Sequence, residues 1–206
     1  MTSYIPQLTL PSAIFNSAPT SILLPIALGT AVGFGTNRSS DQKRKYQILN
    51  QPPLHPPASV FGPVWTLLYG MMGYASYRAY RIGTSSSSPS LLLNNPSIVP
   101  TTYHTSTLYT IQLGLNLIWM PLFFGLRRPI EATIDCAALV GINAYLAYTW
   151  GTQVDKVAGW LMVPYVAWLS FATYLSAGSG YLNDWDFSEE RIRMEERRKR
   201  AQGKDL

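Results

Sequence analysis

The residues best suited to chemistry in this chain form an aromatic stripe. Trp65, Tyr69 and Met72 recur at i, i+4 and i+7, which places them on one face of a helix. An indole and a phenol ring together offer a flat apolar surface with a polar hydrogen at its edge. Such a surface suits a flat, largely apolar ligand, and ordinary helix packing is the competing interpretation of the same spacing.

Two further stretches repeat this combination of tryptophan with small or polar residues. The first places Gln112, Asn116 and Trp119 on one helical face. The second carries Pro164, Trp168, Ala172 and Leu175 on one face. If these helices lie in lipid, unpaired amides are expensive there, so we expect Gln112 and Asn116 to face a bundle interior. Three such faces predict a shared pocket lined by aromatic rings.

The distribution of charge indicates that the elements carrying these faces lie in a membrane. Charged residues are 13% of the 206 residues, against roughly 25% in a typical soluble domain. Between Tyr46 and Leu126 only Arg78 and Arg81 are charged, and the first 37 residues carry no charge. A soluble protein has no comparable stretches, so the composition predicts an integral membrane protein.

The same composition excludes several other classes of function. One cysteine, Cys136, and two distant histidines, His55 and His104, cannot build a disulfide framework or a Cys/His zinc site. No glycine-rich phosphate-binding motif is present, and no groove-reading element accompanies the basic residues, so we expect no nucleic acid partner. The N-terminus lacks the basic start of a signal peptide and the arginines of a transit peptide, so we expect no cleavable address.

Five stretches are long enough to cross a hydrocarbon core of ~30 Å. They lie near residues 13–36, 57–80, 104–125, 130–150 and 158–182. We therefore predict an all-α fold, a membrane-embedded bundle of five transmembrane helices within residues 1–182, followed by a charged cytosolic tail at 183–206. The serine-rich segment 83–102 is expected to be a flexible loop, in which Leu91–Leu93 is a candidate membrane-surface contact. The tail is expected to be solvated, with a short charged helix or a polybasic patch on an anionic membrane as alternatives.

Counting basic residues on alternate sides of the membrane gives the orientation. One side carries thirteen: Arg38, Lys43, Arg44, Lys45, Arg127, Arg128 and seven in the tail. The other side carries three, Arg78, Arg81 and Lys156. The asymmetry predicts that the tail and the first loop are cytosolic and that the N-terminus lies across the membrane.

Three motifs resemble those of a known family. They are HPPASVFGPVWTLLYGMMGYASY (55–77), LGLNLIWMPLFFG (113–125) and PYVAWLSFATYL (164–175). They are similar to motifs of the translocator protein family, the tryptophan-rich sensory proteins also called peripheral benzodiazepine receptors. The resemblance implies a five-helix bundle, often homodimeric, whose cavity opens toward the cytosolic first loop. It also implies binding of porphyrin, haem or sterol-type ligands, and in eukaryotes a mitochondrial outer membrane location, with the endoplasmic reticulum as the alternative.

The resemblance also implies the site. Carried over by position, the ligand-binding residues are His55, Pro56, Pro57, Phe61, Trp65, Tyr69, Asn116, Trp119, Asp135, Trp168, Ala172 and Leu175. For His55, axial ligation of haem and a hydrogen bond within the Pro-Pro turn are the two alternatives. For Asp135, they are an intramembrane functional role and a carboxylate that reaches the interface.

Some positions depart from the family pattern. Leu54, Glu131 and Ser176 stand where relatives carry Trp, Trp and Asn. The sterol-recognition pattern needs a basic residue within about five positions of its tyrosine, but after Tyr181 the first basic residue is Arg191. We therefore expect tetrapyrrole binding rather than cholesterol handling.

The expected function is that of a membrane receptor that binds porphyrin or haem in a tryptophan-lined cavity and regulates tetrapyrrole levels or a stress response. No catalytic residue and no metal ligand is assigned, and no obligatory cofactor is expected. Light-dependent porphyrin degradation and transport of sterol or porphyrin remain the alternatives. The residues themselves only hint at homodimerisation, through small residues at GxxxG-like spacing, namely Gly29 with Gly33 and Ala137 with Gly141, which can equally pack within one chain.

Overall fold

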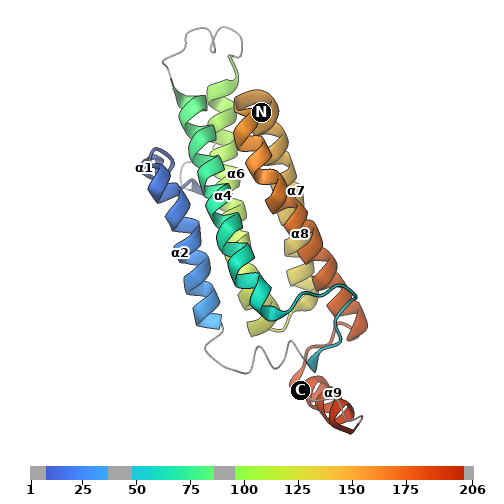
Figure 1. The fold of residues 1–206 in the computed structure, drawn as a ribbon. Coiled ribbons are helices and arrows are strands. Elements are labelled where there is room, and N and C mark those ends of the chain that lie inside the picture. Colours follow the sequence, from blue (N-terminus) through green and yellow to red (C-terminus); the bar gives the residue numbers. More distant parts are fainter. Residues whose placement is uncertain (1–7, 37–47, 86–95, 202–206) are drawn as a thin grey trace.

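The computed structural model describes residues 8–36, 48–85 and 96–201, and all regular structure among them is helical. Five of the described helices are long, and they run alternately up and down in one bundle (Figure 1). The elements are α1 (Ser12–Phe15), α2 (Ala18–Thr36), α4 (Ala58–Thr84), α6 (Ile98–Met120) with the π-helical turn η2 (Pro121–Gly125), α7 (Pro129–Thr149) with the π-helical turn η3 (Trp150–Val154), α8 (Lys156–Leu182) and α9 (Glu189–Ala201).

The lengths and apolar composition of these helices confirm the predicted fold class. Four of the described helical segments are long and apolar enough to cross a membrane: Ala18–Thr36, Ile98–Gly125, Pro129–Val154 and Lys156–Leu182. The 27-residue helix α4 is equally long but less apolar, because tyrosines, glycines and two arginines interrupt its hydrophobic residues. It packs against α2, α6 and α8, and so completes the bundle.

The helix boundaries differ from the expected ones at three places. The first predicted helix is interrupted at residues 16–17, so the four-residue helix α1 precedes α2. Helix α6 begins at Ile98, before the expected residue 104, because a proline such as Pro100 is tolerated in a first helical turn whose N–H groups lack partners anyway. The tail contains the helix α9, which corresponds to the short charged helix that was one of the alternatives for this segment. The basic cluster of residues 38–45, most of the serine run and Leu91–Leu93 lie outside the described residues.

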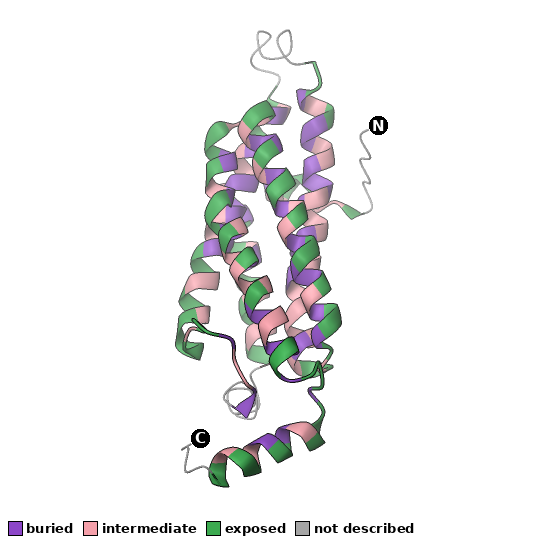
Figure 2. Ribbon diagram, turned by 90° about the vertical axis from the view of Figure 1, so that its right-hand side faces the viewer, coloured by how far each residue is buried: buried purple, intermediate pink, exposed green. Residues whose placement is uncertain are grey.

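Buried residues recur along the bundle helices (Figure 2), and those of α4, α6, α7 and α8 form most of the main hydrophobic core. Glycines allow the closest helix approaches. A methyl group at Gly159 of α8 would overlap the backbone of Gly151 in η3, and one at Gly29 of α2 would overlap the ring of Tyr69. Gly29 therefore takes part in helix packing within the chain, whereas Ala137 and Gly141 lie exposed on α7.

An ion pair fastens the end of the bundle that carries few basic residues, here called the opposite end. Arg78 of α4 donates from Nε to Oδ2 of Asp155 over 2.7 Å. Asp155 also caps α8, because its carboxylate accepts hydrogen bonds from the amides of Val157 and Ala158. Burial of the carboxyl works against ionisation, but the hydrogen bonds from Arg78 and the two amides outweigh it and lower the pKa of Asp155.

This pair gives stability a defined pH dependence. A carboxyl whose folded-state pKa lies below its unfolded value of about 3.9 stabilises the fold above that value, and the contribution is lost as the pH falls through the folded-state pKa. We expect Asp155→Asn to lower the thermal unfolding temperature in detergent at pH 7, and the gap to wild type to shrink below about pH 4. Glu190→Gln, which removes an exposed carboxylate of α9, serves as the control. A gap that stays constant between pH 7 and pH 3 would contradict this account.

Two glycine substitutions test the close packing of α7 and α8. Gly159→Ala is expected to lower the unfolding temperature, because the added methyl has no room beside Gly151. Gly141→Ala meets open space, and alanine favours the helix over glycine by ~1 kcal/mol, so we expect no loss of stability there. If both substitutions changed the unfolding temperature equally, the contact between Gly159 and Gly151 would not limit the packing of α7 against α8.

Candidate functional site

A chain of buried amide and phenol groups joins four helices at the centre of the bundle. Tyr69 of α4 donates to Oδ1 of Asn116 over 2.5 Å. Nδ2 of Asn116 donates to the hydroxyl of Tyr165 over 3.0 Å, and that hydroxyl donates to Oε1 of Gln112 over 3.1 Å. Asn143 of α7 also donates to Oε1 of Gln112, over 3.3 Å. These five residues are named the amide–phenol network below.

The network shows how these polar side chains are accommodated away from water. All five are buried, and each donates or accepts at least one hydrogen bond to another member. A buried polar group without a partner costs several kcal/mol in lipid. The expectation that Gln112 and Asn116 face the interior is therefore confirmed.

Aromatic rings of α4 and α8 pair beside this network. Trp65 packs on Tyr69, with ring centroids 5.4 Å apart, and meets Tyr165 edge-on at 6.2 Å. One turn closer to the start of α4, Phe61 meets Trp168 edge-on at 6.0 Å. Trp65 and Trp168 are both half-buried and pack against the main core. The structure thus brings the two predicted tryptophans to the same α4–α8 interface.

The row of rings continues along α8 toward the segment before α4. Trp168 lies 5.6 Å from Phe171, and Phe171 stacks on Tyr174 at 6.2 Å. The hydroxyl of Tyr174 donates to the carbonyl oxygen of Pro53 over 3.0 Å. The rings therefore connect the network to residues 48–57, which cross the end of the bundle (Figure 1).

Residues 48–57 are fixed to the last turns of α8. The amide of Asn50 donates to Oδ1 of Asn183, and Nδ2 of Asn183 donates back to the carbonyl of Asn50. The hydroxyl of Ser179 donates to Oε1 of Gln51, and a methyl group at Gly178 would overlap the ring of Pro52. This segment therefore covers the end of the bundle where α4 begins and α8 ends, here called the basic end.

His55 and Pro56 lie in this covering segment. His55 is exposed, and its Nδ1 lies 3.2 Å from the carbonyl oxygen of Pro52, which matches the hydrogen-bonded alternative for this residue. Pro56 is half-buried. On α8, Ala172 is half-buried and Leu175 is buried, one and two turns beyond Trp168.

Trp119 and Asp135 stand apart from the paired rings. Trp119 stacks on Phe123 at 5.1 Å and packs against a second cluster at the basic end, which includes Ile48 and Phe187. Asp135 is 8% exposed on α7, and within the described part of the chain its Oδ2 has no hydrogen-bond partner. The structure does not join either residue to Trp65 or Trp168 by a ring contact or a hydrogen bond among the described residues.

The side chains beside the network are mostly aromatic, and one of them carries a hydrogen-bond donor without a partner among the described residues. Within residues 8–36, 48–85 and 96–201, no three His, Cys, Asp or Glu side chains come together to hold a metal ion. The indole Nε1 of Trp168 is buried and has no hydrogen-bond partner among the same residues, so it is an unsatisfied donor there. The surface between α4 and α8 is otherwise aromatic and apolar, as expected for a site that holds a flat ligand.

Two members of the network were missed by reasoning from sequence. Tyr165 lies inside the third motif, where its position three residues before Trp168 places it on the same face. Asn143 is the only amide side chain in the apolar run 136–150, and an amide in lipid is itself a signal. Neither signal says which helix supplies the partner.

Comparisons with known proteins agree with these features. The sequence matches the TspO/MBR family over residues 21–182. It is 42% identical over 161 residues to the translocator protein homolog of Schizosaccharomyces pombe, covering 78% of this chain and 88% of the relative. It is 39% identical to the human translocator protein, over 65% of this chain and 71% of that protein. It is 34% identical to the tryptophan-rich protein TspO of Archaeoglobus fulgidus, over 79% and 94% respectively.

The hydrogen bond between Tyr69 and Asn116 can be tested by removing one hydroxyl. We expect Tyr69→Phe to destabilise the protein by about 1–3 kcal/mol, because a buried amide oxygen loses its donor. Thermal unfolding in detergent, followed by far-UV circular dichroism, measures the effect. Ser170→Ala is the control, because that exposed hydroxyl bonds only within its own helix. Similar stabilities for the two variants would show that the network does not hold the helices together.

Proposed function

The chain belongs to the TspO/MBR family and is an integral membrane protein, and on this premise we propose that it binds a tetrapyrrole, porphyrin or haem, between α4 and α8. The observation that carries the proposal is the cross-helix pairing of Trp65 with Tyr165 and of Phe61 with Trp168. These rings come from two helices that the amide–phenol network ties to α6 and α7.

The chemistry of this surface suits a planar macrocycle. Stacking on indole and phenol rings contributes about 0.5–1.5 kcal/mol per aromatic pair beyond the burial of apolar area. The hydroxyls of Tyr69 and Tyr165 already donate within the network, so they add little polarity to the surface. The Nε1 hydrogen of Trp168 remains to bind a carboxylate or carbonyl oxygen of the ligand.

The surroundings of Tyr181 support a tetrapyrrole over a sterol. Tyr181 is 76% exposed near the end of α8, and the first basic residue after it, Arg191, belongs to α9. A sterol-recognition pattern would need that basic residue about one turn away. The proposed role is that of a receptor that regulates tetrapyrrole levels or a stress response.

We also propose that the membrane is the mitochondrial outer membrane and that the basic end of the bundle faces the cytosol. The support for orientation is the excess of Lys and Arg at that end, thirteen against three. The ligand then enters from the cytosolic side, past residues 48–57, which lie over that end of the α4–α8 interface.

Titration of protoporphyrin into the purified protein tests the site. We expect Trp65→Phe/Trp168→Phe to weaken binding about tenfold, because two stacking surfaces and one indole donor are reduced or lost. The porphyrin absorbance band measures affinity independently of the protein's own fluorophores. Trp160→Phe is the matched control, because Trp160 lies on the same helix but is 73% exposed.

Two results would count against the proposal. Equal affinity of wild type and the double variant would show that the paired rings are not the binding surface. A loss of affinity in Trp160→Phe as large as in the double variant would point to the outer face of α8 instead. Illumination of the complex is a separate measurement: steady bleaching of porphyrin over many turnovers would favour the degradation alternative.

A further inference from the structure

The tail helix α9 lies across the direction of the bundle helices, just beyond their basic end (Figure 2). Only residues 183–188 separate it from α8, which ends at Leu182. Because α9 follows a membrane span so closely and turns across its axis, it remains near the basic end of the bundle rather than continuing along α8.

Specific contacts hold α9 in this place. Ile192 packs in the second cluster with Ile48. Nζ of Lys199 donates to the carbonyl oxygen of Ile48 over 2.7 Å. Arg127, which follows the end of α6, binds Glu189 in the first turn of α9 over 2.6 Å. The tail is therefore docked on the bundle through one face of α9.

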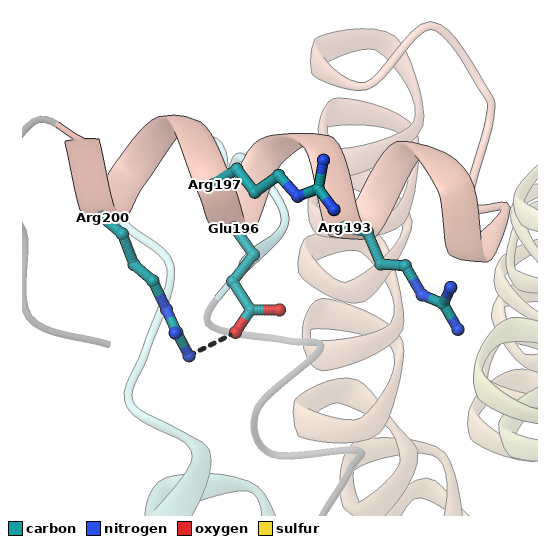
Figure 3. A pocket seen from close by; sticks show the side chains of 4 residues that line it. All are labelled: Arg193, Glu196, Arg197 and Arg200. Carbon is teal, nitrogen blue, oxygen red and sulfur yellow. Dashed lines mark hydrogen bonds and ion pairs between the residues drawn. The ribbon is translucent and has the colours of Figure 1, made fainter.

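A second face of α9 presents three arginines at i, i+4 and i+7. Arg193, Arg197 and Arg200 line a surface hollow together with Glu196 (Figure 3). The side chains of Arg193 and Arg200 are 73% and 69% exposed. Glu196 binds Arg200 over 2.7 Å, and Arg193 lies 3.5 Å from Glu189, a carboxylate that it shares with Arg127. In Figure 3, the side chains of Arg193 and Arg200 extend from α9 toward the bundle.

We infer that this arginine stripe, Arg193–Arg197–Arg200, binds the phosphate of anionic phospholipids at the basic end of the bundle. The guanidinium group matches phosphate with paired N–H donors, and a juxtamembrane cluster of basic residues is attracted by an anionic leaflet. The position and direction of the stripe select a lipid headgroup as the source of the phosphate. This inference is independent of the tetrapyrrole site.

The docking of α9 links this surface to the segment that covers the bundle. Lys199 and Ile192 contact Ile48 on one face of the helix, and the arginine stripe lies on the neighbouring face. Lipid bound to the stripe therefore holds α9 against the bundle end and stabilises the docked position of residues 48–50.

Native mass spectrometry of the full chain in nonionic detergent tests the inference. The protein is mixed with equal amounts of phosphatidylcholine and phosphatidylinositol, and the ratio of the two lipids retained is measured. Wild type is expected to retain phosphatidylinositol preferentially. Arg193→Gln/Arg197→Gln/Arg200→Gln is expected to reduce that preference about tenfold, with unchanged helical content by circular dichroism.

The control removes basic charge from the other end of the bundle. Arg81→Gln/Lys156→Gln eliminates two exposed basic side chains there and is expected to keep the preference of wild type. An equal loss in both variants, or no preference in wild type, overturns the inference. A second test adds inorganic phosphate to the wild-type protein with bound lipid. If phosphate displaces the lipid at an equal concentration, the arginine stripe is a site for free anions and the inference is overturned.

Discussion

The fold depends on one requirement, that five polar side chains at the centre of a lipid-embedded bundle find partners in one another. Tyr69, Asn116, Tyr165, Gln112 and Asn143 come from four helices, and most of their hydrogen bonds cross between helices. Individual hydrogen bonds in membranes contribute modestly, about 0.6 kcal/mol on average, but an amide left alone in hydrocarbon costs far more. The network thus favours the observed rotation of each of these helices, because turning a helix away would remove the hydrogen bonds that its amide or phenol makes here.

That selection also positions the aromatic surface proposed as the binding site. Tyr69 and Tyr165 belong both to the network and to the packing of Trp65, so the indole lies against rings whose hydroxyls are fixed. The pairing of Phe61 with Trp168 follows from the antiparallel course of α4 and α8, one turn further along each helix. A site built on helices held in this way is preorganised, and preorganisation reduces the entropy lost when a ligand binds.

The sequence alone predicted those features of the fold and the site that depend on a physical rule acting along a single helix. Long gaps between charged residues predicted the spans, and the cost of amides in lipid predicted that Gln112 and Asn116 face inward. Periodicity placed Trp65 and Tyr69 on one face of their helix, and Trp168 on one face of another. It cannot identify which helix packs against each face, so the role of Tyr165 was missed. For the same reason Trp119 was grouped with Trp65, although contacts with Phe123 place it in another cluster. A short charged helix in the tail was one of the alternatives, but the docking of α9 was not predicted, because it depends on Ile48 and Arg127, which are distant in sequence.

The two halves of the bundle are packed by different means, and this difference bears on where a ligand can enter. Toward the opposite end, the helices approach closely, since Gly83 lies against the side chain of Thr102 and Gly159 against the backbone of Gly151, while Arg78 and Asp155 fasten α4 to the start of α8. The contact between Gly159 and Gly151 joins two backbones, so it leaves no side chain that can move aside. Toward the basic end, the helices are separated by large rings, which have rotamers to exchange, and by the covering segment 48–57. A planar guest can replace ring–ring contacts with contacts of the same kind, whereas at the opposite end it would have to break an ion pair and force closely packed backbones away from each other. Entry of a planar ligand to the α4–α8 interface is therefore less costly from the basic end than from the opposite end.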